Sequence, residues 1–379
     1  MPSRMRVEIA EQPEALRRTF DALLPQVGAL EALGRETRQV LFIARGSSDN
    51  AAVYGQYLCS VHAGRLASLA TPSVATVYRA DLDLRGVLAV GVSQSGATEE
   101  IVTTLEWARR CGARTAAVTN VAGSPLAEAA DVPLITQAGT ELAVPATKTY
   151  TTQLAALAVL ALSIGKTRGA EAEEPRDVVG AGLEAPQGAP TVGSEAQPDV
   201  AGAGVEGLLA VPDAVEAMLE VAPAAEVLAE RLTYVDTLVV SGRGFAYSTA
   251  LELSLKLKET CYVTAVGLSY ADLVHGPIAI VDADTPALLV AAASGPVLPE
   301  MTGLAGRIAD AGADVYGIGG DADFAAVCRS ALPGPSLPEH LAPFALVVPG
   351  QLLVEALART KGLDPDAPRG LDKVTQTGP

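Results

Sequence analysis

The sequence has few of the residues that build several common kinds of site. Its 379 residues include four cysteines, three histidines, one tryptophan and five phenylalanines. The cysteines are widely spaced and form no CxxC pair, which favours free thiols in a reducing compartment over a disulfide framework. The histidines (His62, His275 and His340) do not cluster in the sequence. We therefore expect no multi-histidine metal site, and we predict no metal or organic cofactor.

Basic residues are fewer than acidic residues. The chain has 27 lysines and arginines against 44 aspartates and glutamates, a formal net charge of −17. Such a surface repels nucleic acids and anionic membranes, so neither is an expected partner. The apolar run 154–164 is too short to span a bilayer, and the charged N-terminal segment lacks the apolar stretch of a signal peptide. These features predict a cytoplasmic protein.

Short apolar segments alternate with helical ones along most of the chain. The predicted strands are residues 40–44, 87–92, 115–119, 132–135, 237–240, 278–281, 287–292, 315–318 and 345–348. The predicted helices include 12–33, 50–62, 98–111, 148–165 and 211–232. This alternation predicts an α/β fold in which helices cover the faces of a mostly parallel sheet.

The strand–helix scheme occurs twice, on either side of a segment without periodicity. That segment, 166–206, is rich in Gly, Ala, Pro and Glu, as in a disordered insert. We predict a helical segment at 1–34, one α/β domain at 35–165, the insert at 166–206, a second α/β domain at 207–363 and a polar tail at 364–379.

The segment 251–258 has an ambiguous pattern. Its leucines alternate strictly with polar residues, as in a strand, but its composition favours a helix, and a helix is our prediction. On a helix, Glu252, Lys256 and Glu259 share one face. Taken alone, Glu252 and Lys256 are more typical of an exposed ion pair than of a site.

Two loops of small polar residues follow predicted strands. Arg45–Ser48 comes after the strand 40–44, and Ser93–Gly96, with Thr98, comes after the strand 87–92. Hydroxyls and helix N-terminal N–H groups at such positions can bind a phosphate, and neighbouring loops would face one crevice. Ser and Gly are equally typical of a simple N-cap and turn.

Several ordered motifs together resemble a known family. The segments RGSSDN, SQSGATEE and AGTELAVPATKTYTTQLA resemble a SIS (sugar isomerase) domain. The segments GRGFAYSTALELSLKLKETCY and YADLVHGPIAIVDAD resemble the second SIS domain of the isomerase half of glucosamine-6-phosphate synthase, and PRGLDKVTQT resembles its catalytic tail. The leading EQPEAL resembles the segment just upstream of the same half. The resemblance implies two SIS domains, each a flavodoxin-like three-layer sandwich, and covers the chain apart from the insert.

The resemblance also implies roles for individual residues. Glu259 matches the carboxylate that moves a proton between C1 and C2. His275 matches the histidine that opens the sugar ring, reaching across from the other subunit of a homodimer. Lys373 matches the tail lysine that forms a Schiff base with the open-chain keto sugar. The implied sugar-phosphate-binding residues are Ser47, Ser48, Ser93, Gln94, Ser95, Thr98 and Val144, with Glu252 and Lys256 in support.

The chain departs from the synthase in ways that bear on the reaction. Pro2 follows Met1, and no glutaminase domain with its nucleophilic cysteine is recognised, so we expect that glutamine does not supply ammonia within this chain. Ala146 replaces a serine, Arg45 replaces a frequent cysteine, and Asp372 also differs. The RGSSDN and KLKETC spellings are closer to stand-alone hexosamine-6-phosphate deaminases and related deglycases.

These observations predict a glucosamine-6-phosphate deaminase/isomerase that yields fructose 6-phosphate and ammonia. An ammonia-dependent synthase, a fructosamine-6-phosphate deglycase and a galactosamine 6-phosphate substrate remain open. A non-catalytic sugar-phosphate sensor predicts loss of the Glu, His and Lys set, which is present. A dinucleotide-binding oxidoreductase is disfavoured, because Gly242-Arg243-Gly244 lacks the third glycine at the required spacing.

Overall fold

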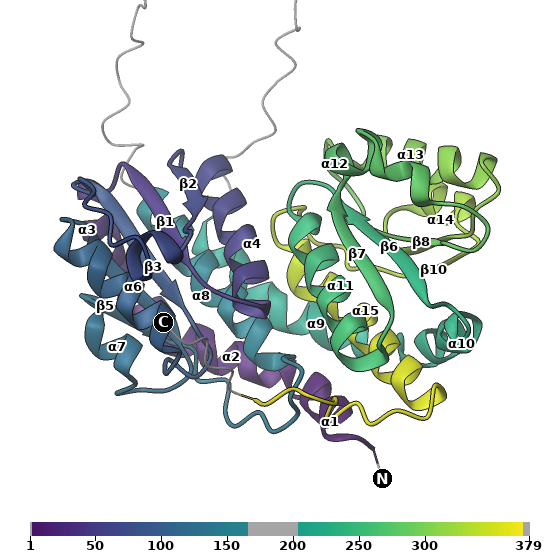
Figure 1. The fold of residues 1–379 in the computed structure, drawn as a ribbon, viewed down its shortest axis with the longest axis horizontal. Helices are drawn as coiled ribbons and strands as arrows, with labels where there is room; N and C mark the ends of the chain where they lie inside the picture. Colours follow the sequence, from purple (N-terminus) through teal and green to yellow (C-terminus); the bar gives the residue numbers. More distant parts are fainter. Residues whose placement is uncertain (1, 166–203, 374–379) are drawn as a thin grey trace, which may run out of the picture.

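Each half of the chain builds a five-stranded parallel sheet. The structure, a computed structural model, describes residues 2–165 and 204–373 (Figure 1). The first sheet has the strand order β2-β1-β3-β4-β5 and the second has the order β10-β9-β8-β6-β7. Read from its other edge, the second order repeats the first, and both match the flavodoxin-like arrangement. The predicted α/β fold with two flavodoxin-like units is therefore confirmed.

The strands of the first sheet are β1 (Gln39–Ile43), β2 (Leu66–Leu69), β3 (Val87–Val92), β4 (Arg114–Thr119) and β5 (Val132–Ile135). The helices of this half are α1 (Arg4–Ala10), α2 (Gln12–Leu23), the 3-10 helix η1 (Leu24–Gln26), α3 (Val27–Glu36), α4 (Ser47–Val61), α5 (Ser73–Thr76), α6 (Glu99–Arg110), α7 (Pro125–Ala129) and α8 (Lys148–Gly165). The single helix predicted at 12–33 is thus divided between α2, η1 and α3, and α1 precedes them within the predicted helical segment 1–34.

The strands of the second sheet are β6 (Thr237–Gly242), β7 (Thr264–Ser269), β8 (Ala287–Ala291), β9 (Val315–Gly319) and β10 (Ser330–Leu332). The helices of this half are η4 (Val205–Ala210), α9 (Val211–Leu219), α10 (Ala222–Leu232), α11 (Ala246–Cys261), α12 (Tyr270–Val274), η5 (Pro277–Ile280), α13 (Leu298–Asp310), α14 (Ala322–Val327) and α15 (Ala342–Thr360). Most of the predicted insert lies outside the described residues, but its end, Val205 and Glu206, belongs to η4.

Helices between the two sheets join the halves into one core. In the first half α4 packs against α8, in the second α11 packs against α15, and α4 also contacts α11 across the junction (Figure 1). The side chains of α8 and α15 are buried over nearly their whole length, and one apolar cluster contains residues of both halves. A helix that is apolar all round is stable only when neighbours cover every face. The junction therefore fixes the position of one sheet relative to the other.

Among the described residues, one helix is long and apolar enough to cross a membrane. It is α15, and 94% of its most apolar window is buried inside the protein. Residues 345–348, predicted as a strand, lie inside this helix, so that prediction was wrong. A continuous apolar run does not distinguish a buried strand from a buried helix. The strand predicted at 278–281 was also wrong, because Pro277 starts the 3-10 helix η5 there.

Two of the three histidines meet at the junction. The rings of His62, at the end of α4, and His340, before α15, lie 4.5 Å apart beside Phe245. Their separation in the sequence hid this contact. Burial lowers the pKa of His62, and burial together with the neighbouring His62 lowers the pKa of His340 to about 4. No group of three or more metal-ligating side chains occurs within residues 2–165 and 204–373.

We expect this histidine pair to make stability depend on pH. Because the pKa values of both rings are lower in the folded state, their contribution is complete above the unfolded pKa of about 6.5 and is lost as the pH falls toward 4. The predicted loss at pH 5 is on the order of 1 kcal/mol, allowing for solvent screening. Urea unfolding at pH 7.5 and pH 5 measures it, and His340→Gln should reduce the difference. An unchanged pH dependence in that variant would contradict the assignment.

Candidate active site

A pocket of about 340 Å³ lies at the carboxyl end of the first sheet. Its walls come from the loops after β1 and β3, from the segment before α8, from α11 of the second half and from the C-terminal tail. The strands β1 and β3 are neighbours in the sheet. The next strand after β1 lies on one side of this pair and the next strand after β3 lies on the other, so the strand order reverses between them. Parallel α/β sheets bind ligands in the crevice at this position.

The pocket brings together ten of the twelve predicted site residues. They are Ser47, Ser48, Ser93, Gln94, Ser95, Thr98, Val144, Lys256, Glu259 and Lys373. Ala146 and Arg45, where the chain departs from the synthase pattern, also line it. Glu252 and His275 do not. The polar loops, the α11 face and the tail are thus gathered at one place, although the loop at 45–48 lies more than 200 residues from both Lys256 of α11 and the tail in the sequence.

The two strand-end loops lead into helix N-termini that face the pocket. Ser47 and Ser48 form the first turn of α4, directly after Gly46, whose φ of +60° suits glycine. Thr98 precedes α6, and the Ser93 Oγ lies 3.5 Å from the Thr98 Oγ1. Hydroxyls combined with the N–H groups and the dipoles of two helix N-termini make a site suited to an anion such as a phosphate.

Gly96 lets the second loop turn tightly. Its φ is +62°, and a Cβ atom there would lie 2.1 Å from the Ser124 Oγ. The loop therefore excludes a side chain at this position, and its close backbone packing keeps the hydroxyls of Ser93 and Ser95 at the pocket wall. A small-residue loop is a structural requirement here as well as a suitable anion site.

Arg45 adds a fixed positive charge at the rim. Its guanidinium makes two hydrogen bonds to the Glu100 carboxylate, at 3.0 and 3.2 Å, and Glu100 lies in the first turn of α6. A bidentate pair of this kind holds the guanidinium in one orientation.

The face of α11 places a buried lysine between two carboxylates. The Lys256 Nζ lies 2.6 Å from the Glu259 Oε2 and 3.6 Å from the Glu252 Oε1, and the Lys256 side chain is 1% exposed. Burial alone would lower the pKa of Lys256, but the two carboxylates outweigh it and raise the pKa. Lys256 is therefore a charged residue that orients Glu259, whose partly exposed carboxylate faces the pocket.

Glu252 lies beneath the pocket and does not line it. It is completely buried and accepts hydrogen bonds from the Ser47 Oγ at 2.9 Å and the Asn50 Nδ2 at 2.8 Å, both on α4. Burial, with a contribution from Glu259, raises the pKa of Glu252 against the opposing effect of Lys256. The interpretation of Glu252 and Lys256 as an exposed surface pair is wrong. Glu252 joins the first-half loop to the second-half helix.

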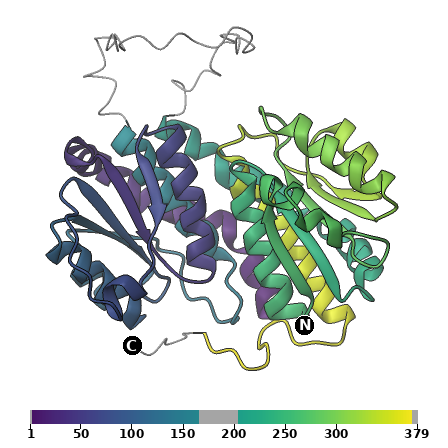
Figure 2. The same ribbon diagram turned by 45° about the horizontal axis from the view of Figure 1, so that its top comes forward.

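Lys373 closes the pocket from the tail. Its Nζ donates to the Glu141 Oε2 at 2.6 Å and to the backbone carbonyl of Ala143 at 2.7 Å. The tail reaches this position by crossing from the second half to the first (Figure 2). Along the way the Arg369 guanidinium stacks on the Tyr262 ring at 4.2 Å, and the Val144 N–H donates to the Asp366 carbonyl at 2.9 Å. The tail is thus attached at several points.

His275 lies outside the pocket. It follows α12 in the second half, its side chain is exposed, and its Nδ1 lies 2.6 Å from the Ala271 carbonyl oxygen. Within one chain the structure does not bring it to Lys373 and Glu259. The prediction that it reaches the site of a second subunit remains a prediction.

The sequence analysis missed Glu141 as a site residue. Glu141 entered that analysis only as part of the motif AGTELAVPATKTYTTQLA. A glutamate just before the buried start of a long helix is a signal, because a carboxylate at a helix N-terminus meets free N–H groups. Its pairing with a lysine 232 residues away required the structure.

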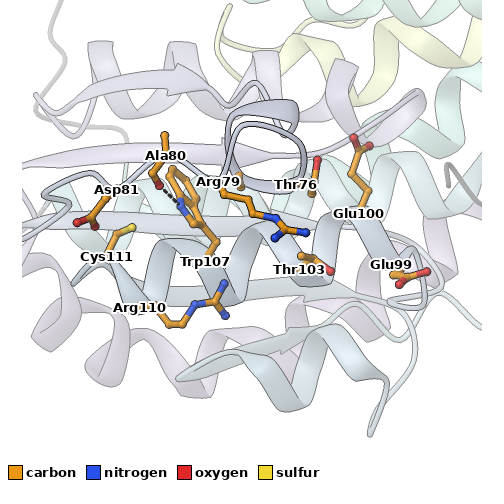
Figure 3. Close-up of a pocket in the computed structure, with 11 residues that line it drawn as sticks. Thr76, Arg79, Ala80, Asp81, Glu99, Glu100, Thr103, Trp107, Arg110 and Cys111 are labelled. Atoms are coloured by element: carbon orange, nitrogen blue, oxygen red, sulfur yellow. Dashed lines mark hydrogen bonds between the residues drawn. The ribbon is translucent and has the colours of Figure 1, made fainter. Parts of the chain in front are cut away.

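A second pocket, of about 480 Å³, lies on the outer side of the first half between α5 and α6 (Figure 3). Two arginines, Arg79 and Arg110, line it together with the acidic Asp81, Glu99 and Glu100. The Trp107 Nε1 donates to the Ala80 carbonyl at 2.7 Å along its wall (Figure 3). This pocket has mixed charge and is not formed by strand-end loops, so it is less suited to a phosphate than the first.

Comparison with known proteins agrees with this geometry. The SIS domain matches residues 35–163. A solved structure from Silicibacter pomeroyi DSS-3, assigned as a phosphosugar isomerase, is 31% identical, with a TM-score of 0.77 over 96% of this chain and 100% of that chain. The chain belongs to the SIS-domain family.

Two further SIS relatives have named reactions. The C-terminal domain of glucosamine-fructose-6-phosphate aminotransferase from Francisella tularensis has a TM-score of 0.83 at 26% identity, over 97% of this chain and 99% of that domain. The glutamine–fructose-6-phosphate aminotransferase of Thermococcus kodakarensis is 33% identical over 98% of this chain. The chain spans 58% of the length of such curated relatives. The predicted resemblance to the isomerase half is confirmed.

Proposed function

We propose that the chain is a glucosamine-6-phosphate deaminase/isomerase that forms fructose 6-phosphate and ammonia. The observation that carries the proposal is the joint presence of Glu259, Lys373 and the hydroxyl-lined loops around one pocket. The loops suit the phosphate, the carboxylate suits proton transfer and the amine suits the open-chain sugar. The proposal includes a homodimer in the cytoplasm, with His275 supplied by the partner subunit.

In the proposed mechanism, His275 of the partner subunit first opens the sugar ring. Glu259 then takes the proton from C2 and returns it to C1, while a proton passes from the nitrogen to the C1 oxygen. The 2-amino aldehyde thereby becomes a C2 imine with a hydroxyl on C1. Water adds to C2, ammonia leaves, and fructose 6-phosphate remains. Lys373 holds the open-chain ketose as a Schiff base. Lys256, at 2.6 Å from Glu259, keeps that carboxylate directed at the sugar carbons.

Synthesis of glucosamine 6-phosphate from fructose 6-phosphate and ammonia is the second candidate. The observation that favours it is the name of the relatives, which are aminotransferases acting on fructose 6-phosphate. The same residues serve both directions, because each proton transfer is reversible. A deglycase acting on fructosamine 6-phosphate and a galactosamine 6-phosphate substrate use the same pocket chemistry.

The test is an assay of the purified chain in both directions. We expect ammonia release from glucosamine 6-phosphate to exceed release from galactosamine or fructosamine 6-phosphate. In the reverse direction, fructose 6-phosphate would be supplied with ammonium chloride or with glutamine. Synthesis without measurable ammonia release would establish the second candidate. Binding of the sugar phosphates without turnover in any assay would favour a sensor and would refute the enzyme.

A further inference from the structure

Glu141 is a buried carboxylate that faces the pocket amine. Its side chain has no exposed surface, and its Oε2 accepts from the Lys373 Nζ at 2.6 Å. The Oε1 accepts from the backbone N–H groups of Thr147 and Thr149 at 2.9 and 3.1 Å, and the Thr149 hydroxyl donates to the Oε2 at 2.6 Å. A carboxylate with this many donors has one orientation, and that orientation is directed at the tail lysine.

Neighbouring groups stabilise the negative charge of Glu141. Burial would raise its pKa, but the Lys373 ammonium and the hydrogen bonds from Thr149 and Thr147 outweigh burial and lower the pKa. The donors at Thr147 and Thr149 belong to the start of α8, where the helix dipole also favours a negative charge. Glu141 is therefore anionic while it faces the Lys373 ammonium.

The segment that carries Glu141 is attached to the N-terminal helix and to the tail. The Glu8 carboxylate of α1 accepts from the backbone N–H groups of Leu142 and Ala143. The Asp366 side chain accepts from the backbone N–H groups of Arg4 and Met5, both at 2.8 Å. These bonds connect the Glu141 segment to α1 and α1 to the tail. The backbones that carry Glu141 and Lys373 are therefore held at a fixed distance.

We propose that Glu141 is the positioning residue for Lys373 and the proton relay for its Schiff base. This inference rests on the proposed function, because it assumes that Lys373 reacts with a sugar carbonyl. The ammonium passes one proton to Glu141 as the freed nitrogen lone pair attacks the carbonyl carbon. Glu141 passes that proton to the carbonyl-derived oxygen, which leaves as water with a second proton from nitrogen. The iminium that remains carries the same charge as the original ammonium and faces the same carboxylate.

Glu141→Gln tests this proposal, because glutamine keeps hydrogen-bonding capacity at Thr147 and Thr149 but removes the charge. The full-length chain would be incubated with fructose 6-phosphate and sodium borohydride, and the reduced adduct on Lys373 would be measured by mass spectrometry. We expect trapping to be slowed by roughly 10–100-fold, because a displaced amine loses its reactive geometry. We also expect a changed pH profile and partial recovery in Glu141→Asp.

Two controls separate positioning from a general structural role. Glucitol 6-phosphate has no carbonyl, so its dissociation constant in Glu141→Gln should stay within about twofold of wild type if the phosphate site is intact. Glu11→Gln removes the carboxylate bonded to Lys148 at the start of the same helix, outside the pocket, and should trap at the wild-type rate.

The outcomes are distinct. Wild-type trapping in Glu141→Gln, or loss of glucitol 6-phosphate binding in proportion to trapping, would overturn the role of Glu141 and leave the proposed function intact. Wild-type protein that turns over substrate but gives no adduct on Lys373 would overturn the Glu141 proposal together with the Schiff-base step. Wild-type protein that neither traps nor turns over any of the sugar phosphates would overturn the proposed function as well.

Discussion

Glu259→Gln is expected to lower turnover of glucosamine 6-phosphate by about 10²–10⁴-fold, the usual contribution of a positioned general base. Glutamine has nearly the same shape, and its amide oxygen can still accept the hydrogen bond that the Lys256 Nζ makes at 2.6 Å. The hydrogen-bond partner of the Glu259 carboxylate is Lys256 on the same helix, not the loops after β1 and β3 that we propose to bind the phosphate. The loss should therefore appear in kcat, with the affinity for sugar phosphate preserved.

The measurements are steady-state kinetics and binding of glucitol 6-phosphate by calorimetry. Glu216→Gln is a matched control, because Glu216 is an exposed carboxylate of α9 that pairs with Arg17 and does not line the pocket. It should retain wild-type kinetics. Full activity in Glu259→Gln would remove the proton-transfer role from this residue, and lost binding with unchanged kcat would make it a binding residue instead.

The fold was largely predictable because central strands and long helices have strong patterns. The strand predicted at 87–92 and the helix predicted at 148–165 coincide with β3 and α8. The missed strands, β2, β7 and β10, all lie at sheet edges. An edge strand is covered by fewer neighbours, so short mixed segments such as Leu66–Leu69 suffice and give no clear apolar pattern.

The part of the candidate site that is formed by strand-end loops was predictable from the order of strands along the chain. Serine-rich loops after parallel strands meet at one sheet edge by topology alone. Burial and pairing were not predictable in the same way. Glu252 and Lys256 have the spacing of an ordinary surface pair, and only the packing of α11 within the folded chain removes both from solvent. The ion pair of Glu141 with Lys373 depends on the path of the tail, which has no periodic pattern.

A heterodimer of Lys373→Ala with His275→Ala is expected to regain about half of the wild-type activity, although each variant alone loses about 10²-fold or more. Lys373 lies in the pocket of its own chain, whereas His275 is exposed and outside it. If His275 acts across a two-fold axis, one site of the heterodimer combines an intact Lys373 with the intact His275 of the partner subunit. The other site lacks both.

The experiment uses co-expression with two affinity tags, purification of the doubly tagged heterodimer and an ammonia-release assay. A heterodimer of Lys373→Ala with Glu259→Gln is the matched control, because both of these residues line the same pocket of one chain. Each of its sites lacks one group, so it should stay inactive. If the His275 pair also stays inactive while its parents fold and bind glucitol 6-phosphate, His275 does not complete the neighbouring site. Because its side chain lies outside the pocket of its own chain, ring opening would then need another acid within the pocket.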